Sequence, residues 1–205
     1  MSDFNALNLE NYNKLAPLYD TYLNLSFEME TNWYAEVEKR FQDMGLVNNK
    51  VIDIGCGTGT LGIFLGNLGY DVLGLDNSSN MLIVARNKLR LFNMNRENTR
   101  DTLMKHAYLV ANPGAKVHFS KIKPRIRFIE GDILGNSNVK ESFGTATLFD
   151  TLHCISPDDL EKLFMNVSSL LLPNGVFSLL YFTGLSFKSG IETSDIEKEY
   201  VDYHV

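Results

Sequence analysis

The stretch VIDIGCGTGTLG, residues 51 to 62, limits the possible folds more than any other part of the chain. A short apolar run leads directly into glycines at positions 55, 57, 59 and 62. Glycine is unfavourable inside strands and helices, so this clustering indicates a strand–turn–helix unit whose backbone must come close to something. In an open α/β sheet, ligands bind at such a turn, beyond the carboxyl end of the strand.

Apolar runs and helical patterns alternate along the remainder of the chain. Strands are predicted at residues 50–55, 70–76, 126–132, 145–150 and 176–182, and helices at 60–69, 78–92 and 156–172. Ser78 or Ser79 could cap the second of these helices, and Ser156, followed by Pro157, could cap the third. Regular alternation predicts a doubly wound, Rossmann-like α/β fold with a mostly parallel sheet.

The length of 205 residues suits one domain. Residues 1–48 read as helical and precede the α/β core of residues 49–182. An insertion at 94–125 is longer than an ordinary connection. Only the acidic segment 183–205 follows the fifth predicted strand, and it is short for a region that would add further strands to the sheet. Its YVDYHV stretch could form at most one strand. We therefore expect C-terminal antiparallel strands to be abbreviated or absent.

Charge and composition exclude several classes of function. The net charge is −6, which argues against general binding to nucleic acid or anionic membranes. Two distant cysteines, no signal-peptide pattern and no apolar run long enough to span a bilayer predict a soluble, cytoplasmic protein. Residues 86–127 carry eleven Lys and Arg but two acidic residues. This basic stretch is either a solvated excursion or a cover that attracts an anionic acceptor.

Acidic residues follow three of the predicted strands. Asp53 precedes the glycines, Asp76 ends the second strand and Asp132 follows the third. Carboxylates at these positions suit an ammonium group, ribose hydroxyls and the amine of a purine, respectively. The glycine spacing G-x-G-x-G also departs from the G-x-G-x-x-G of dinucleotide sites. The implied ligand has an ammonium group, a ribose and an aminopurine, and no phosphate.

Four ordered motifs together resemble the class I S-adenosylmethionine-dependent methyltransferases of the small-molecule type. The motifs are VIDIGCGTGTLG, GLDNSSNMLIVAR, FIEGDI and LHCISPDDLEKLFMNVSSLLLPNGVF. The resemblance covers roughly residues 10 to 182. It implies S-adenosylmethionine as cofactor, S-adenosylhomocysteine as product, and methyl transfer to a small molecule.

The resemblance also implies which residues hold the cofactor. The methionine part would contact Asp53, Gly55, Cys56 and Gly57. The ribose and adenine would contact Asp76, Asn77, Met81, Asp132 and Ile133, while the Phe149 carbonyl would face the cofactor amine. NYNKLAPLYDTYL is similar to the lid helix of small-molecule members, so Tyr12 and Tyr19 would close over the site.

Asp150 and His153 are the candidates for a general base, because FDTLHC follows the fourth strand, where the acceptor should lie. A structural role for either residue is an open alternative. Each cofactor position also has a structural alternative: a packing turn at the glycines, a helix cap at Asp76, a turn former at Asp132, or a core methionine at Met81. No spacing of ligands predicts a metal site.

The motifs after the fourth strand exclude some acceptors. LFDTLHCIS lacks the Asn/Asp-Pro-Pro-aromatic motif of base amino-methyltransferases and the glutamate pair of protein-arginine methyltransferases. Two other functions remain as alternatives. One is a non-catalytic cofactor-binding or partner protein, which the short C-terminal segment and the basic insertion favour. The other is an NAD-dependent oxidoreductase, which the glycine spacing and Asp53 disfavour. The sequence does not identify the acceptor atom.

Overall fold

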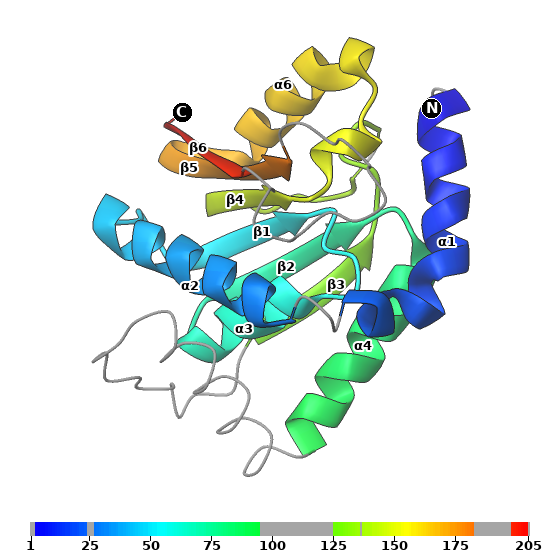
Figure 1. Cartoon of the computed structure of the whole chain (residues 1–205). Helices are drawn as coiled ribbons and strands as arrows, with labels where there is room; N and C mark the ends of the chain where they lie inside the picture. Colours follow the sequence, from blue (N-terminus) through cyan, green and yellow to red (C-terminus); the bar gives the residue numbers. More distant parts are fainter. Residues whose placement is uncertain (1–2, 24–26, 95–124, 136, 183–197, 205) are drawn as a thin grey trace.

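A six-stranded sheet forms the centre of the computed structural model, which describes residues 3–23, 27–94, 125–135, 137–182 and 198–204 (Figure 1). The strand order is β3-β2-β1-β4-β5-β6. Strands β1 to β5 pair in parallel, and β6 runs antiparallel to β5. The strands are β1 (Lys50–Ile54), β2 (Asp71–Asp76), β3 (Arg125–Glu130), β4 (Phe143–Phe149), β5 (Leu171–Phe182) and β6 (Lys198–His204). The predicted mostly parallel α/β sheet is thereby confirmed.

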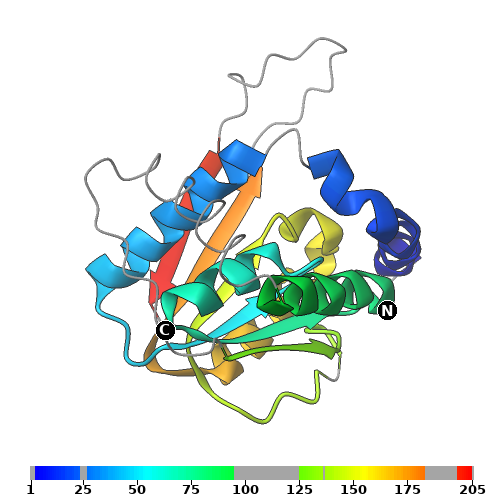
Figure 2. The same ribbon diagram turned by 90° about the horizontal axis from the view of Figure 1, so that it is seen from below.

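Helices cover both faces of the sheet. On one face, α2 (Phe27–Met44) packs with α3 (Thr60–Leu68), and α4 (Ser79–Met94) lies beside α3 (Figures 1 and 2). The other face is covered by α6 (Leu160–Leu170). The short 3-10 helices η2 (Leu152–Cys154) and η3 (Pro157–Asp159) join β4 to α6. The remaining helix, α1 (Asp3–Leu23), stands at the carboxyl ends of the parallel strands (Figure 1).

Alternation along β1 explains how one short strand supports both layers. Ile52 and Ile54 belong to the apolar cluster that packs against α6. Val51 points to the opposite face and packs with α2 and α3. Successive side chains of a strand face opposite sides of its sheet, so a strand covered on both faces reads as a continuous apolar run. Asp53, at 2% exposure, is a buried charged residue within this run.

Glycines follow two of the helices, and the two predicted serine caps have different outcomes. Gly45 and Gly69 adopt left-handed φ angles of 63° and 107° directly after α2 and α3. The Ser78 hydroxyl accepts a hydrogen bond from Met81 N at 3.1 Å, so Ser78 caps α4. Ser156 makes no side-chain cap. Ser156 does stand at an N-cap position directly before Pro157, but it is that of the 3-10 turn η3, whereas the N-cap of α6 is Asp159.

The fifth strand begins earlier than the predicted 176–182, because it includes the LPNG stretch. Strand pairing begins at Leu171, opposite Phe143, and the register shifts before Val176, which pairs level with Thr145. Asn174, with a φ of 63°, lies inside this irregularity. β5 is longer than predicted because the turn residues form a bulge within it rather than separating it from α6.

One antiparallel strand, β6, is present at the end of the chain. It pairs with β5 from Val176 opposite His204 to Phe182 opposite Lys198. The abbreviated C-terminal region expected from the sequence therefore includes at least this strand. Most of the predicted basic insertion 94–125, and residues 183–197 of the acidic segment, lie outside the described residues.

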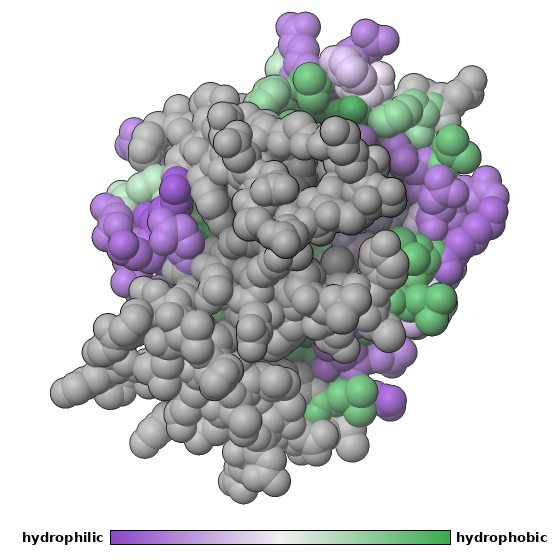
Figure 3. All heavy atoms as spheres, in the orientation of Figure 1, coloured by the Kyte–Doolittle hydropathy of each residue, from purple (hydrophilic) through white to green (hydrophobic). Residues whose placement is uncertain are grey.

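The outward side of α1 carries apolar side chains between hydrophilic ones (Figure 3). Phe4, Leu7, Leu15 and Leu18 are all exposed. None of the helices in the described part of the chain has the length and apolar character needed to cross a membrane.

Candidate functional site

The turn after β1 is held close to the end of β2 by its own backbone. The N–H groups of Gly55 and Cys56 both donate to the Leu75 carbonyl, at 2.8 and 3.1 Å. Gly55 has a φ of 68°, and a Cβ atom there would lie 2.4 Å from the Thr151 side chain. Position 55 therefore requires glycine for two reasons: its backbone is left-handed, and Thr151 approaches it closely.

The other glycines of the turn serve different purposes. Gly57 also has a left-handed φ, 52°, but a Cβ atom there would meet nothing within 4 Å. A Cβ atom on Gly59 would lie 2.5 Å from the Phe128 ring, so that glycine permits packing against β3. Gly57 is thus the position at which the backbone of the turn faces open space, as expected where a ligand approaches.

Asp76, at the end of β2, is fixed by backbone donors from two sides. Its Oδ2 accepts from Gly57 N and its Oδ1 accepts from Ser78 N, each at 2.8 Å. Burial raises the pKa of this carboxyl group, and the backbone hydrogen bonds oppose that rise. The glycine turn and the helix α4 thus share one carboxylate, which also lines the pocket described below.

The segment after β3 contributes both a carboxylate and an apolar wall. Asp132 Oδ1 accepts from Leu134 N at 2.9 Å, which closes a local turn. Ile133 is 8% exposed, and its carbonyl accepts from Asn166 Nδ2 on α6 at 2.6 Å. Asp132, Ile133 and Leu134 all line the pocket, with Ile155 from the β4–α6 connection.

Thr151, just past β4, was not predicted and holds two strand ends together. Its hydroxyl donates to the Phe149 carbonyl at 2.9 Å and lies 3.3 Å from the Gly55 carbonyl. Asp150 between them has a φ of 49°, a left-handed angle that is unusual for a residue with a side chain. The carbonyl predicted to face a cofactor amine is therefore already engaged by one hydroxyl, with its second lone pair left over.

Helix α1 forms the wall opposite the sheet. Tyr12 and Tyr19, both predicted, line the pocket with ring centroids 6.2 Å apart. Three further residues of α1 were missed: Asn5, Asn8 and Leu9. The three-to-four-residue spacing of the lining positions from 5 to 19 could have revealed them, because such residues share one helical face.

Two groups of polar contacts fasten α1 to the core. Lys88 Nζ on α4 donates to Asp20 Oδ1 at 2.8 Å, and to the hydroxyls of Thr58 and Thr60 at 2.9 and 2.8 Å. The Ser78 hydroxyl donates to Asn13 Oδ1 at 2.8 Å. The first group links α1 to the glycine turn and the second links it to the start of α4.

Asn5 and Tyr12 attach the same helix to the β4–α6 connection. Asn5 Nδ2 donates to Asp159 Oδ2 at 3.0 Å. The Tyr12 hydroxyl lies 3.0 Å from His153 Nε2. Partial desolvation lowers the pKa of His153 and burial raises the pKa of Tyr12, so at neutral pH the phenol donates and the imidazole accepts.

Three predicted site residues are not among those that line the pocket. Asp53 is buried beneath α3, where its Oδ1 accepts from the Thr147 hydroxyl at 2.9 Å, and burial raises its pKa to about 7. The Cys56 side chain packs with the apolar cluster around Phe128, and burial raises its pKa. His153 is exposed behind Tyr12.

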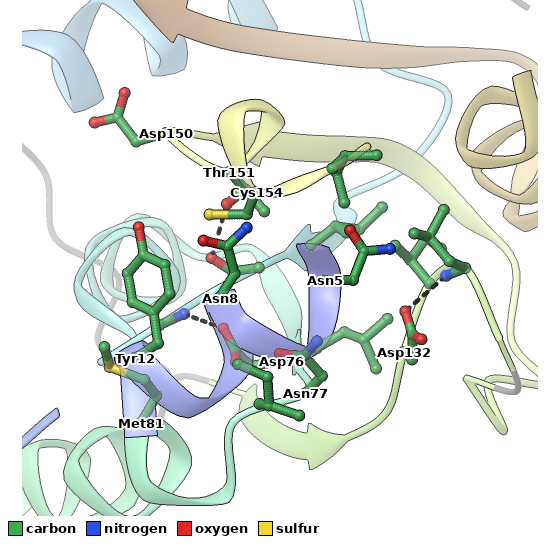
Figure 4. A pocket seen from close by; sticks show the side chains of 18 of the residues that line it. Asn5, Asn8, Tyr12, Asp76, Asn77, Met81, Asp132, Asp150, Thr151 and Cys154 are labelled. Atoms are coloured by element: carbon green, nitrogen blue, oxygen red, sulfur yellow. Dashed lines mark hydrogen bonds between the residues drawn. The ribbon is translucent and has the colours of Figure 1, made fainter. Parts of the chain in front are cut away.

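The pocket between α1 and the sheet encloses about 850 Å³, including space open to solvent (Figure 4). Its lining includes most of the predicted residues: Tyr12, Tyr19, Gly55, Gly57, Asp76, Asn77, Met81, Asp132, Ile133, Phe149 and Asp150. Apolar side chains and two carboxylates fixed at the ends of β2 and β3 suit an adenosyl group, and the open face of Gly57 leaves room for its substituent. Within the described residues, no group of His, Cys, Asp and Glu is placed to hold a metal ion.

A family model described as a methyltransferase domain matches residues 52–177. The chain belongs to the methyltransferase domain family. The matched region runs from β1 into β5 and contains every predicted site residue except Tyr12 and Tyr19. Family membership disfavours the alternative of an NAD-dependent oxidoreductase.

Two curated relatives match parts of the chain. Carboxy-S-adenosyl-L-methionine synthase of Nautilia profundicola is 26% identical over 167 residues, covering 80% of this chain and 53% of that protein. A protein of Geobacillus sp. (strain WCH70) named "Putative methyltransferase" is 36% identical over 78 residues, covering 38% of this chain and 31% of that protein. The matched regions thus span about half or less of the length of these relatives.

Solved structures share the fold. A DhpI complex with S-adenosylhomocysteine aligns with 94% of this chain and 76% of its own, at a TM-score of 0.57 and 18% identity. The glycopeptide N-methyltransferase MtfA complexed with S-adenosylmethionine aligns with 84% of this chain and 66% of its own, at a TM-score of 0.52 and 18% identity. At such identities the likeness establishes the architecture, and the chemistry must be argued from the site.

Proposed function

We propose that this chain binds S-adenosylmethionine between α1 and the sheet and transfers its methyl group to a small-molecule acceptor. The observation that carries this proposal is the Asp76 carboxylate. It lines the pocket, it is held by Gly57 N and Ser78 N, and it adjoins a backbone turn that is open at Gly57. A carboxylate fixed at this strand end suits the vicinal hydroxyls of a ribose.

A sulfonium cofactor supplies an electrophilic methyl group, so the chain itself need only orient the reactants and exclude water. The strand ends would position one side of the cofactor. Tyr12 and Tyr19 on α1 would cover the other side, since α1 is tied to the core through Asp20 and Lys88. In this arrangement α1 acts as the lid that the sequence predicted.

The described lining favours an uncharged or cationic acceptor. It contains the carboxylates of Asp76, Asp132 and Asp150 but no Lys, Arg or His among the described residues. The basic stretch of the sequence led to the prediction of an anionic acceptor, but most of that stretch lies outside the described residues. That prediction is untested, and the acidic lining speaks against it.

Asp150 is the better placed of the two candidate bases. It lines the pocket, whereas His153 lies behind the Tyr12 hydroxyl. We therefore assign His153 the role of positioning Tyr12 through its Nε2 atom. Asp150 would accept a proton only from an acceptor that must lose one during transfer.

Calorimetric titration tests the cofactor assignment. Wild type should bind S-adenosylmethionine and S-adenosylhomocysteine but not NAD, and Asp76→Ala should weaken both sulfur ligands at least tenfold, about 1.4 kcal/mol or more. Asp158→Asn, an exposed carboxylate on η3, is the matched control and should bind like wild type. Failure of wild type to bind either sulfur ligand would refute the proposal. Binding without turnover over a panel of amines, phenols and thiols would instead favour a non-catalytic cofactor-binding protein.

A further inference from the structure

The amide of Asn8 on α1 faces the pocket with a donor for which the described residues offer no partner. Its Nδ2 atom is buried and donates to no acceptor in the described chain. Its neighbours on the same face are engaged: Asn5 bonds to Asp159, and Tyr12 bonds to His153. A buried donor without an acceptor raises the free energy of the unliganded protein. A ligand oxygen that accepts a hydrogen bond at this point would remove that unfavourable contribution.

The surroundings of Asn8 indicate which oxygen. Figure 4 draws its side chain close to Thr151 and Cys154, which follow the carboxyl end of β4, and all three residues line the pocket together with Asp76 and Asn77. Thr151 bridges the carbonyls of Phe149 and Gly55, which are acceptors suited to an ammonium group. In an amino acid the carboxylate shares a carbon atom with the ammonium group, so it must lie close by.

A carboxylate bound at this end needs a hydrogen-bond donor, and several donors of the lining are already engaged. No cationic side chain is found among the described lining residues. The N–H groups of Gly55, Cys56 and Gly57 already donate to Leu75 or Asp76, and the Thr151 hydroxyl already donates to Phe149. The Asn8 Nδ2 atom is buried and uncommitted within the described chain, and a hydrogen bond to an ionised oxygen is the strongest that it can make.

On these grounds, and resting on the cofactor assignment proposed above, we propose that Asn8 Nδ2 donates to the α-carboxylate of the methionine part of S-adenosylmethionine. Asn8 thereby recognises the cofactor and is not a catalytic residue. It distinguishes ligands that carry the carboxylate from those that lack it, and it does so with a neutral donor in an otherwise acidic pocket.

The test pairs two ligands with two variants in calorimetric titrations. S-adenosylhomocysteine carries the carboxylate, and decarboxylated S-adenosylhomocysteine lacks it but keeps the ammonium group. Asn8→Asp preserves the shape of the side chain and replaces the donor by a carboxylate. Asn11→Asp, exposed on the same helix, introduces the same charge away from the pocket.

We expect Asn8→Asp to weaken S-adenosylhomocysteine at least tenfold and to leave the decarboxylated ligand unchanged or bound more tightly. Asn11→Asp should change neither ligand more than twofold. The melting temperature of Asn8→Asp should fall below that of wild type, because the variant places a carboxylate where a buried neutral amide stood, so binding of the decarboxylated ligand is the check that the variant is folded.

Equal weakening of both ligands, or of neither, in Asn8→Asp would overturn the assignment of Asn8 while leaving cofactor binding by wild type intact. Absence of S-adenosylhomocysteine binding in wild type would instead overturn the proposed function, and the assignment with it. The two failures are therefore distinguished by the wild-type titration alone.

Discussion

The two walls of the pocket are built in different ways. The sheet wall is fixed by backbone: Gly55 and Gly57 adopt left-handed angles, and their N–H groups bond to Leu75 and Asp76 at the end of β2. The lid wall, α1, is fixed by side chains that reach residues far away in the sequence, such as the contact between Asp20 and Lys88. In the first wall an atom added at Gly55 would lie 2.4 Å from Thr151, whereas in the second wall the loss of one side-chain contact should only weaken the attachment of α1.

Gly55→Ala should cause the largest loss. The new methyl group would enforce a left-handed angle on alanine and lie 2.4 Å from Thr151. We expect the free energy of unfolding to fall by about 2–4 kcal/mol, measured by chemical denaturation. Gly57→Ala is the matched control: it carries the same backbone strain without a clash, so it should lose only about 1 kcal/mol. Equal losses of unfolding free energy in the two variants would show that the Thr151 side chain can move away from the new methyl group without a cost in stability.

Asp53→Asn tests the buried charge beneath the sheet wall. The pKa of Asp53 is raised from 3.8 to about 7, so its contribution to stability is present below pH 3.8 and is lost as the pH rises to 7. Asparagine keeps an oxygen for the Thr147 hydroxyl and carries no charge. We expect Asp53→Asn to be more stable than wild type by about 1–3 kcal/mol at pH 8 and nearly equal at pH 4.

Thermal unfolding across this pH range checks the expectation. Asp43→Asn, on the exposed side of α2, should show no such divergence from wild type. A constant difference between Asp53→Asn and wild type from pH 4 to pH 8 would mean that Asp53 does not titrate in this interval.

Lys88→Met should have a smaller effect, confined to the lid. It removes the ammonium group that joins Asp20 to Thr58 and Thr60, and the free energy of unfolding should fall by about 1 kcal/mol. Affinity for S-adenosylhomocysteine should fall by roughly threefold to tenfold, because part of the binding energy must then order α1.

Lys14→Met serves as the comparison for Lys88→Met. Lys14 pairs with Glu10 one turn away on the exposed side of α1, and such pairs contribute below about 0.5 kcal/mol. If both variants leave ligand affinity unchanged, the polar contacts of α1 do not position the lid, and the contrast between the two walls fails.

The sheet wall was largely predictable. Asp76 follows Gly57 of the glycine turn by 19 residues, and the regular geometry of a parallel sheet brings consecutive strand ends to one edge. The family match confirms the resemblance to methyltransferases that this pattern carried. Asp53 and Cys56 are not among the lining residues, because alternation along β1 and tight packing direct their side chains into the core.

By itself, then, the sequence determined the fold class, the family and the edge of the sheet at which a ligand binds, since these depend on periodicity and on glycine at left-handed positions. Only the tertiary structure decided how the lid completes the pocket: that Thr151 bridges two strand ends, that His153 stands behind Tyr12, and that Asn8 presents a buried donor. These contacts join residues far apart in the chain or depend on a partner outside it. No local pattern encodes such contacts, because they arise only when the helix and the sheet pack together.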